Sequence, residues 1–176
     1  MPISIEIKEE NQQLIQKVSD LVKLYDRESI TVWASLSSSI IKKCLETNNT
    51  LPFSFSMKRG VVLLLLFYSG LLPFVPIHES LLQFYLPRVM NRTFIPDQRI
   101  LRNRLVVCLL EIVTMRKSLF KHLADRGIQV HLFVCNTDED ITAALELGAT
   151  GVMTDYPSLL SNYFYKDHPQ KGAGRS

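Results

Sequence analysis

Short apolar runs alternate with segments of helical spacing along most of the chain, and this rhythm constrains the fold more than any other feature. In "ISIEIK" apolar and polar residues alternate with a period of two, which is typical of a strand. Apolar residues at helical spacing then follow from Leu14 to Tyr25. The complete pattern predicts strands at residues 3–8, 30–34, 52–57, 129–135 and 151–154. No hairpin dipeptide joins these runs, so we expect a parallel sheet with right-handed crossovers.

The polar residues of the first strand favour a barrel over an open doubly wound sheet. A strand that helices cover on both faces is apolar throughout, whereas a barrel strand has one face toward the interior. The face toward the helices would hold Ile3, Ile5 and Ile7, and the interior face Ser4, Glu6 and Lys8. A complete (β/α)8 barrel needs about eight strands in about 250 residues, but this chain has 176 residues. The predicted fold class is α/β: an incomplete (β/α)8 TIM barrel of about five parallel strands, with a hydrophobic insertion.

Further signals set the limits of the predicted domain. The rhythm breaks between residues 60 and 100 and returns with a long helical segment over residues 100–126, which Gly127 would cap. A capping box of Thr137 and Asp140 would begin a later helix. The polar tail 166–176 is predicted to be disordered, so the domain would cover residues 1–165.

Charge and cysteine usage exclude several classes of function. The net charge of +3 is too weak to indicate nucleic-acid binding, and the basic residues are not interleaved with aromatic ones. The cysteines Cys44, Cys108 and Cys135 form no CxxC pair, so they indicate neither a disulfide framework nor a zinc knuckle. The first residues carry charges where a secretory signal peptide has an apolar core, so we expect no signal peptide.

The last predicted strand ends on two polar residues, Thr154 and Asp155. In a parallel α/β sheet the loops after the strands converge where ligands bind, which makes these residues candidates for a site. Alternatively, Asp155 caps the turn before Pro157 in an Asx-type role. The sequence pattern alone leaves both interpretations open.

Three segments, "IEIK", "VHLFVCN" and "GATGVMTDYP", give the chain a resemblance to a known family because of their order and spacing. From Ile3 to about Tyr163 the chain resembles the C-terminal part of the glycerophosphodiester phosphodiesterase family. The segments "GLLPFVPI" and "TMRKSLFKHLADRGIQV" are similar to its membrane-associated lysophospholipase D branch. The resemblance implies metal-dependent hydrolysis of lysophospholipids or glycerophosphodiesters, which releases the head group and, from a lysophospholipid, leaves lysophosphatidic acid.

The resemblance also assigns roles to individual residues. Glu6 matches a metal-binding glutamate for calcium or magnesium, and Lys8 a basic residue of the phosphate pocket. Phe133 stands where most relatives carry a pocket tryptophan, and Asn136 and Asp155 match polar residues at strand ends. For Glu6 and Lys8 the alternative is a surface ion pair at the end of a strand.

The residues that would perform catalysis in the family have no match in this chain. Its His-Arg-Gly, its Glu-x-Asp and its second histidine are absent, and we interpret His131 as structural. We therefore name no catalytic residue, and expect the metal to bind weakly and the chain alone to be inactive. The alternative function is that of a truncated, non-catalytic membrane-associated form.

The apolar run at residues 60–77 carries no charge but holds two prolines in its last third, which favours a hairpin or interfacial segment over a spanning helix. Basic residues before it, and Arg88 and Arg92 after it, could bind anionic lipid head groups. The alternative is a buried helix that covers the barrel. The predicted membrane contacts are Lys58, Arg59, Leu63, Leu66, Phe67 and Phe74. The expected location is the endoplasmic reticulum or perinuclear membrane.

Overall fold

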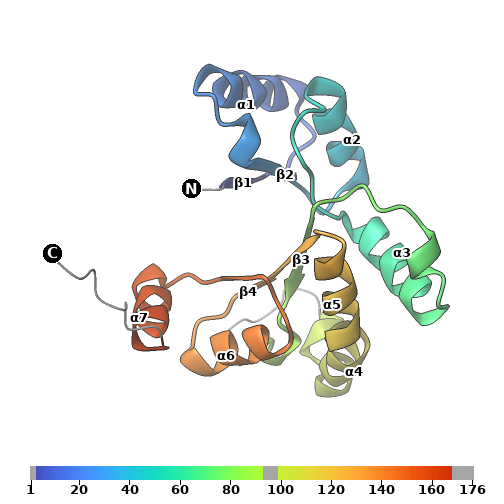
Figure 1. The fold of residues 1–176 in the computed structure, drawn as a ribbon, viewed down its shortest axis with the longest axis vertical. Coiled ribbons are helices and arrows are strands. Elements are labelled where there is room, and N and C mark those ends of the chain that lie inside the picture. Colours follow the sequence, from blue (N-terminus) through green and yellow to red (C-terminus); the bar gives the residue numbers. More distant parts are fainter. Residues whose placement is uncertain (1–2, 93–98, 168–176) are drawn as a thin grey trace, which may run out of the picture. The chain divides into compact units, whose positions relative to one another are not determined.

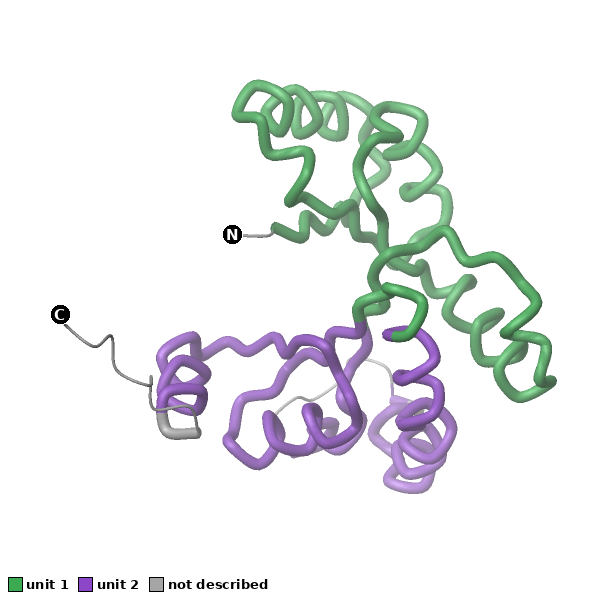
Figure 2. Tube along the Cα trace, in the orientation of Figure 1, with its two compact units in different colours: residues 1–83, 125–129 green, residues 84–124, 130–176 purple. Residues whose placement is uncertain are grey.

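The computed structural model describes residues 3–92 and 99–167. The chain divides into two compact units, coloured separately in Figure 2. Unit 1 comprises residues 1–83 and 125–129, and unit 2 comprises residues 84–124 and 130–176. Each unit holds parallel strands with helices between them, so the predicted α/β class with parallel strands is confirmed.

Unit 1 is built on a parallel pair of strands. Strand β1 (Ile3–Glu6) pairs with β2 (Thr31–Ala34), with Ile5 opposite Trp33. Helices α1 (Gln12–Leu24) and α2 (Ser38–Thr47) lie side by side in Figure 1 and contact each other. The other elements are α3 (Met57–Tyr68) and the short 3-10 helices η1 (Glu28–Ile30) and η2 (Leu72–Phe74).

Trp33 is the centre of the core of unit 1. Its side chain is fully buried, and its indole N–H donates to the carbonyl oxygen of Asn48 over 3.3 Å. Ile7 and Ile15 belong to the same buried cluster, and Ile5 packs against it. Ile5 and Ile7 of the first predicted strand therefore face the helices, as its alternation predicts, whereas Ile3 is 43% exposed.

The predicted strand at residues 52–57 is shorter than expected. The structure has only two isolated parallel bridges there, Trp33 with Phe53 and Ser54 with Leu81. The segment still makes hydrogen bonds on both sides, because Ser54 N donates to Trp33 O and Phe55 N donates to Leu81 O. Its extension is limited because α3 begins at Met57.

A three-stranded sheet, most of it in unit 2, has the order β3 (Leu81–Tyr85), β4 (Gln129–Phe133), β5 (Gly151–Met153). Strands β4 and β5 are parallel, with His131 opposite Gly151. The first residues of β3 and of β4 belong to unit 1. The helices are η3 (Pro87–Val89), η4 (Arg99–Arg102), α4 (Arg104–Thr114), α5 (Lys117–Asp125), α6 (Asp138–Glu146) and α7 (Pro157–Asp167).

Three sequence-based predictions need correction. Strand β3 lies where we saw only a break in rhythm, because "LLQFY" has no polar alternation and its first two residues are buried. The predicted helix over residues 100–126 is divided into η4, α4 and α5, and Met115 (ψ 66°) ends α4 with a non-helical backbone. Helix α7 extends to Asp167, beyond the predicted start of the tail, and residues 168–176 lie outside the described part.

Candidate functional site

Three polar residues meet where β4 and β5 of unit 2 end, and we call Asn136, Thr154 and Asp155 the strand-end cluster. The amide oxygen of Asn136 accepts from Thr154 Oγ1 over 2.9 Å and from Asp155 N over 3.0 Å. The amide nitrogen of Asn136 donates to Asp155 Oδ2 over 2.8 Å. Asn136 is thus held by both polar residues that end the last strand.

The side chain that bonds to the turn before Pro157 is that of Thr154, whereas the alternative interpretation assigned this role to Asp155. The backbone N–H of Tyr156 donates to Thr154 Oγ1 over 3.1 Å. The carboxylate of Asp155 instead accepts from Asn136 of the neighbouring strand connection. Asp155 thus joins the two strand ends, and its role in a site stays a prediction.

The backbone just before the cluster is strained. Val134 has a φ of +64°, a left-handed conformation that β-branched residues rarely adopt. One residue later, Cys135 N donates to Met153 O over 3.0 Å, so the pairing with the neighbouring strand resumes. Strain of about 1–3 kcal/mol at one residue persists only where the surroundings enforce it, and it is common beside functional sites.

Phe133, predicted to form a pocket wall, packs against a second aromatic ring. Its ring centroid lies 4.1 Å from that of Tyr85 on β3. Both side chains are half-buried. Sequence reasoning missed Tyr85 because it missed β3, although the apolar run ahead of Pro87 was an available signal.

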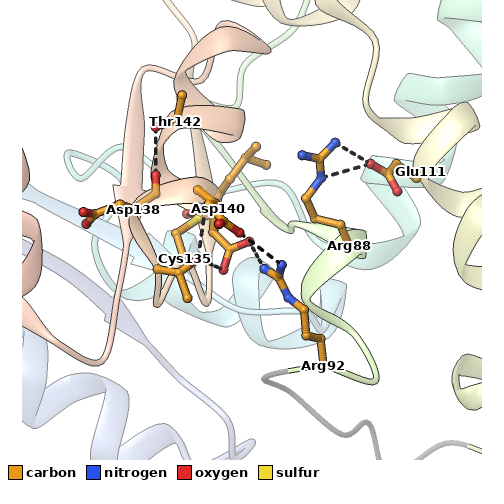
Figure 3. Close-up of polar contacts among 10 residues, drawn as sticks. Arg88, Arg92, Glu111, Cys135, Asp138, Asp140 and Thr142 are labelled. Carbon is orange, nitrogen blue, oxygen red and sulfur yellow. Dashed lines mark hydrogen bonds and ion pairs between the residues drawn. The ribbon is translucent and has the colours of Figure 1, made fainter.

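An ion pair between a buried carboxylate and a partly exposed arginine lies at the connection that follows the cluster (Figure 3). Asp140, fully buried on α6, is paired with Arg92. Asp140 N donates to Thr137 Oγ1 over 3.2 Å, so Thr137 caps α6 as predicted, and the return bond to Asp140 Oδ2 comes from the Thr137 hydroxyl over 2.8 Å. Burial, helped by the charge of Asp140, raises the pKa of Cys135 to about 11. The local pattern found the cap, but not the distant arginine.

In unit 1, Glu6 and Lys8 form the exposed ion pair that was the alternative interpretation. Their charged atoms lie 3.7 Å apart, and the side chains are 46% and 78% exposed. Among residues 3–92 and 99–167, no group of three or more His, Cys, Asp or Glu side chains is placed to hold a metal ion. The described residues of this chain therefore do not fit a complete metal site.

His131 packs against β5. A Cβ atom at Gly151 would lie 2.7 Å from His131 Cδ2, so the imidazole occupies the space that only glycine leaves open. Burial lowers the pKa of His131. These contacts support the structural interpretation of this histidine.

The predicted membrane-contact residues differ in exposure. Phe74 is 83% exposed and Lys58 is exposed, whereas Leu63 is buried at 3% and Leu66 and Phe67 are half-buried. Leu63 therefore does not lie on the accessible face of α3. Within the described part of the chain, every helix falls short of the length and apolar character that crossing a membrane requires.

The arginines in and around the apolar run have acidic partners. Arg59 donates to the buried carboxylate of Glu79 from Nε and Nη2, over 2.5 and 3.2 Å. Burial alone would raise the pKa of Glu79, but these bonds and nearby backbone N–H groups outweigh it and lower that pKa below its ordinary value. Arg88 pairs with Glu111, as Arg92 does with Asp140 (Figure 3).

Shallow grooves lie beside the first and last strands. One of about 690 Å³ has Ile3, Ile5 and Leu21 in its lining, and one of about 450 Å³ has Met153, Leu160 and Phe164. In their sheets β1 and β5 each have one strand neighbour. Among the described residues, the outer edges of both strands are therefore unpaired.

Comparisons with known proteins agree on one family. The model of the Glycerophosphoryl diester phosphodiesterase family matches residues 1–159. Lysophospholipase D GDPD3 of Homo sapiens is 45% identical over 168 residues, which are 96% of this chain and 53% of the relative. Lysophospholipase D GDPD1 of Homo sapiens is 43% identical, over 93% of this chain and 52% of the relative. The chain thus spans about half the length of these relatives.

Solved structures show the same fold. A putative glycerophosphodiester phosphodiesterase from Galdieria sulphuraria has a TM-score of 0.59 at 12% identity, covering 93% of this chain and 57% of the other. A glycerophosphodiester phosphodiesterase from Agrobacterium tumefaciens has a TM-score of 0.54 at 13% identity, and the match covers 92% of this chain and 55% of the other. The match to about half of each solved chain agrees with the incomplete barrel that the strand count predicts.

Proposed function

We infer the function of this chain from the premise that it belongs to the glycerophosphoryl diester phosphodiesterase family. We propose that it supplies the C-terminal part of a lysophospholipase D, which hydrolyses the phosphodiester of a lysophospholipid or glycerophosphodiester. The products from a lysophospholipid are the free head group and lysophosphatidic acid. The observation that carries this proposal is the strand-end cluster, because the polar residues that the resemblance assigns to the pocket are joined across two strands.

The cluster is suited to orienting a polar substrate. The amide of Asn136 is held from both its oxygen and its nitrogen, so its position is set before a ligand arrives. Such preorganisation lowers the entropic cost of binding. The neighbouring rings of Phe133 and Tyr85 would contact the glycerol or acyl portion of the substrate.

The chain has little of a metal site. The family generally depends on a divalent metal ion, and calcium takes six to eight oxygen ligands. Glu6 offers one carboxylate, which lies beside the Lys8 ammonium. We propose Glu6 as a ligand and Lys8 as a phosphate contact only in a protein that supplies further ligands from elsewhere, and we expect this chain alone to hold calcium or magnesium weakly.

The two histidines that would transfer protons in the family's reaction also have no match in this chain. General acid and base catalysis typically contributes about 10² to 10⁴ in rate, so a chain without these groups should not turn over substrate. The second candidate function is that of a truncated, non-catalytic membrane-associated form, and the lack of a match to the family's catalytic histidines is what supports it.

We further propose that the chain associates with the endoplasmic reticulum or perinuclear membrane through α3 and η2. Val61, Leu65 and Phe74 are exposed apolar residues, and Lys58 adds an exposed positive charge. Deletion of residues 61–72 should move the protein from the membrane fraction to the soluble fraction. Insoluble aggregate from the deletion, with a parent that does not float with vesicles, would contradict this proposal.

A chimaera tests the enzymatic proposal. The upstream half of human lysophospholipase D GDPD3 would be joined to this chain, and choline release from lysophosphatidylcholine would be measured with millimolar magnesium or calcium. We expect release from the chimaera and none from the 176-residue chain. Asp155→Ala in the chimaera should lower the rate at least about tenfold, whereas Leu24→Ser, at an exposed position of α1, should leave it unchanged. Equal rates for Asp155→Ala and the parent chimaera would refute the assignment of the cluster to the site.

A further inference from the structure

Helix α4 exposes a row of apolar side chains, which we call the α4 stripe: Leu105, Cys108, Leu109 and Ile112. Leu105, Leu109 and Ile112 are 79%, 62% and 57% exposed. The spacing of three, four and seven residues places them on one face of the helix. The opposite face carries Val107 and Thr114, which are buried. Exposed apolar side chains gathered on one helix face are typical of a surface that contacts a membrane or another protein.

Positive charge lies at both ends of the stripe. Arg104 is exposed at the first position of α4, and Arg116 and Lys117 are exposed just after its end. The one acidic residue of the helix, Glu111, accepts from Arg88 Nη2 over 3.0 Å, so its charge is already balanced. The exposed face of α4 is therefore apolar in the middle and cationic at its two ends.

We propose that the α4 stripe lies in the interface of an anionic lipid surface. An in-plane helix buries its apolar face among acyl chains while Lys and Arg side chains contact acidic head groups, and α4 has both parts in that arrangement. The apolar part is about 10 Å long at 1.5 Å per residue, which suits a shallow contact rather than a spanning one. This surface belongs to unit 2 and does not depend on α3 or on the proposed enzymatic reaction.

Completion of the sheet does not account for the stripe. Helix α4 belongs to the connection between β3 and β4, which are already neighbours in the sheet. The open edges of the chain are at β1 and β5 instead, where the two grooves lie. A lipid surface matches the cationic ends of α4 better than a second copy of the chain, which would bring the same positive charges against them.

Cys108 allows a direct test in the full chain. It is the exposed cysteine of the stripe, while Cys44 and Cys135 are buried. An environment-sensitive fluorophore on Cys108 should shift to shorter wavelength when vesicles of phosphatidylcholine with phosphatidylserine are added, and should not shift with phosphatidylcholine alone. An unchanged spectrum with the anionic vesicles overturns the proposal. A shift that needs no lipid and grows with protein concentration also overturns it, because it would indicate a second copy as the occupant.

Substitutions then separate the apolar and charged contributions. Leu105→Ser with Leu109→Ser should weaken partition onto the anionic vesicles at least about tenfold, and Arg104→Gln should weaken it about fivefold. Leu24→Ser on α1, 73% exposed in the parent, is the matched control and should bind as the parent does. Circular dichroism verifies that each variant is folded. Parent-like partition of the double variant, or an equal loss in the Leu24→Ser control, would show that the stripe is not the lipid contact.

Discussion

Each unit contains one buried carboxylate paired with an arginine, but the two pairs have different surroundings. In unit 1, Glu79 pairs with Arg59 at the first turn of α3, and the candidate residues Glu6 and Lys8 contact each other in an exposed position. In unit 2, Asp140 pairs with Arg92 and is also bonded to Thr137, the N-cap of α6, which follows Asn136 directly. The candidate residues of unit 2 are therefore joined across two strand ends of their own unit, whereas those of unit 1 contact each other along one exposed segment.

The largest expected effect comes from removing the buried charge of unit 2. Asp140→Ala leaves the guanidinium of Arg92 without its main partner and removes the cap contact with Thr137. We expect a loss of about 3 kcal/mol in the free energy of unfolding, measured by urea denaturation. Asp138→Ala, at an exposed position two residues earlier, is the matched control and should cost much less. Equal losses would mean that the pair does not hold unit 2 together.

The Arg59–Glu79 pair of unit 1 should make the stability of the protein depend on pH in the acid range. The pKa of Glu79 is lower in the folded protein than its ordinary value of 4.5, so its ion pair stabilises the fold above that pH and this stability is lost as the pH falls through the folded pKa. Glu79→Gln should cost about 2 kcal/mol at pH 7. It should also flatten the pH dependence of stability below about pH 5. A variant whose thermal midpoint falls with acid as steeply as that of the parent would contradict this role, and exposed Glu46→Gln serves as the control.

The hydrogen bonds of the strand-end cluster should contribute little to the free energy of unfolding but should protect the backbone of the cluster from local opening. Asn136→Ala removes three hydrogen bonds, part of them at exposed positions, which should cost about 1 kcal/mol. Amide hydrogen exchange of Asp155, whose N–H is bonded to Asn136, should accelerate in the variant. Unchanged exchange at Asp155 would show that the cluster is not preorganised by Asn136.

The smallest effect is expected from the exposed pair of unit 1. Glu6→Gln should change the free energy of unfolding by less than about 1 kcal/mol, because exposed ion pairs contribute little. In the chimaera with the upstream half of the human relative, the same substitution should raise the magnesium concentration required for activity. A large loss of stability in the isolated chain would mean that Glu6 is already part of a formed structure in unit 1.

Sequence reasoning succeeded where the physical signal is local. The period-two pattern of "ISIEIK" located β1 and its buried face, and the rule that parallel strands present their ends together located Thr154 and Asp155. It failed for β3, whose "LLQFY" lacks alternation, and for the break at Met115 inside a continuous helical pattern. Arg92 and Asp140 are 48 positions apart, and the sequence around either residue does not indicate that the other is its partner. The left-handed backbone of Val134 could not be predicted either, because valine rarely adopts a positive φ.

The close approach of His131 to Gly151 has a consequence for how this sequence can change over evolutionary time. Because a Cβ atom at position 151 would lie 2.7 Å from His131 Cδ2, a mutation of Gly151 forces the imidazole to move, and it costs less once position 131 has become smaller. The order of the two substitutions therefore matters, and lineages that keep histidine at 131 should keep glycine at 151. An alignment of relatives would show the two positions as a covarying pair, with larger residues at 151 found only beside small residues at 131.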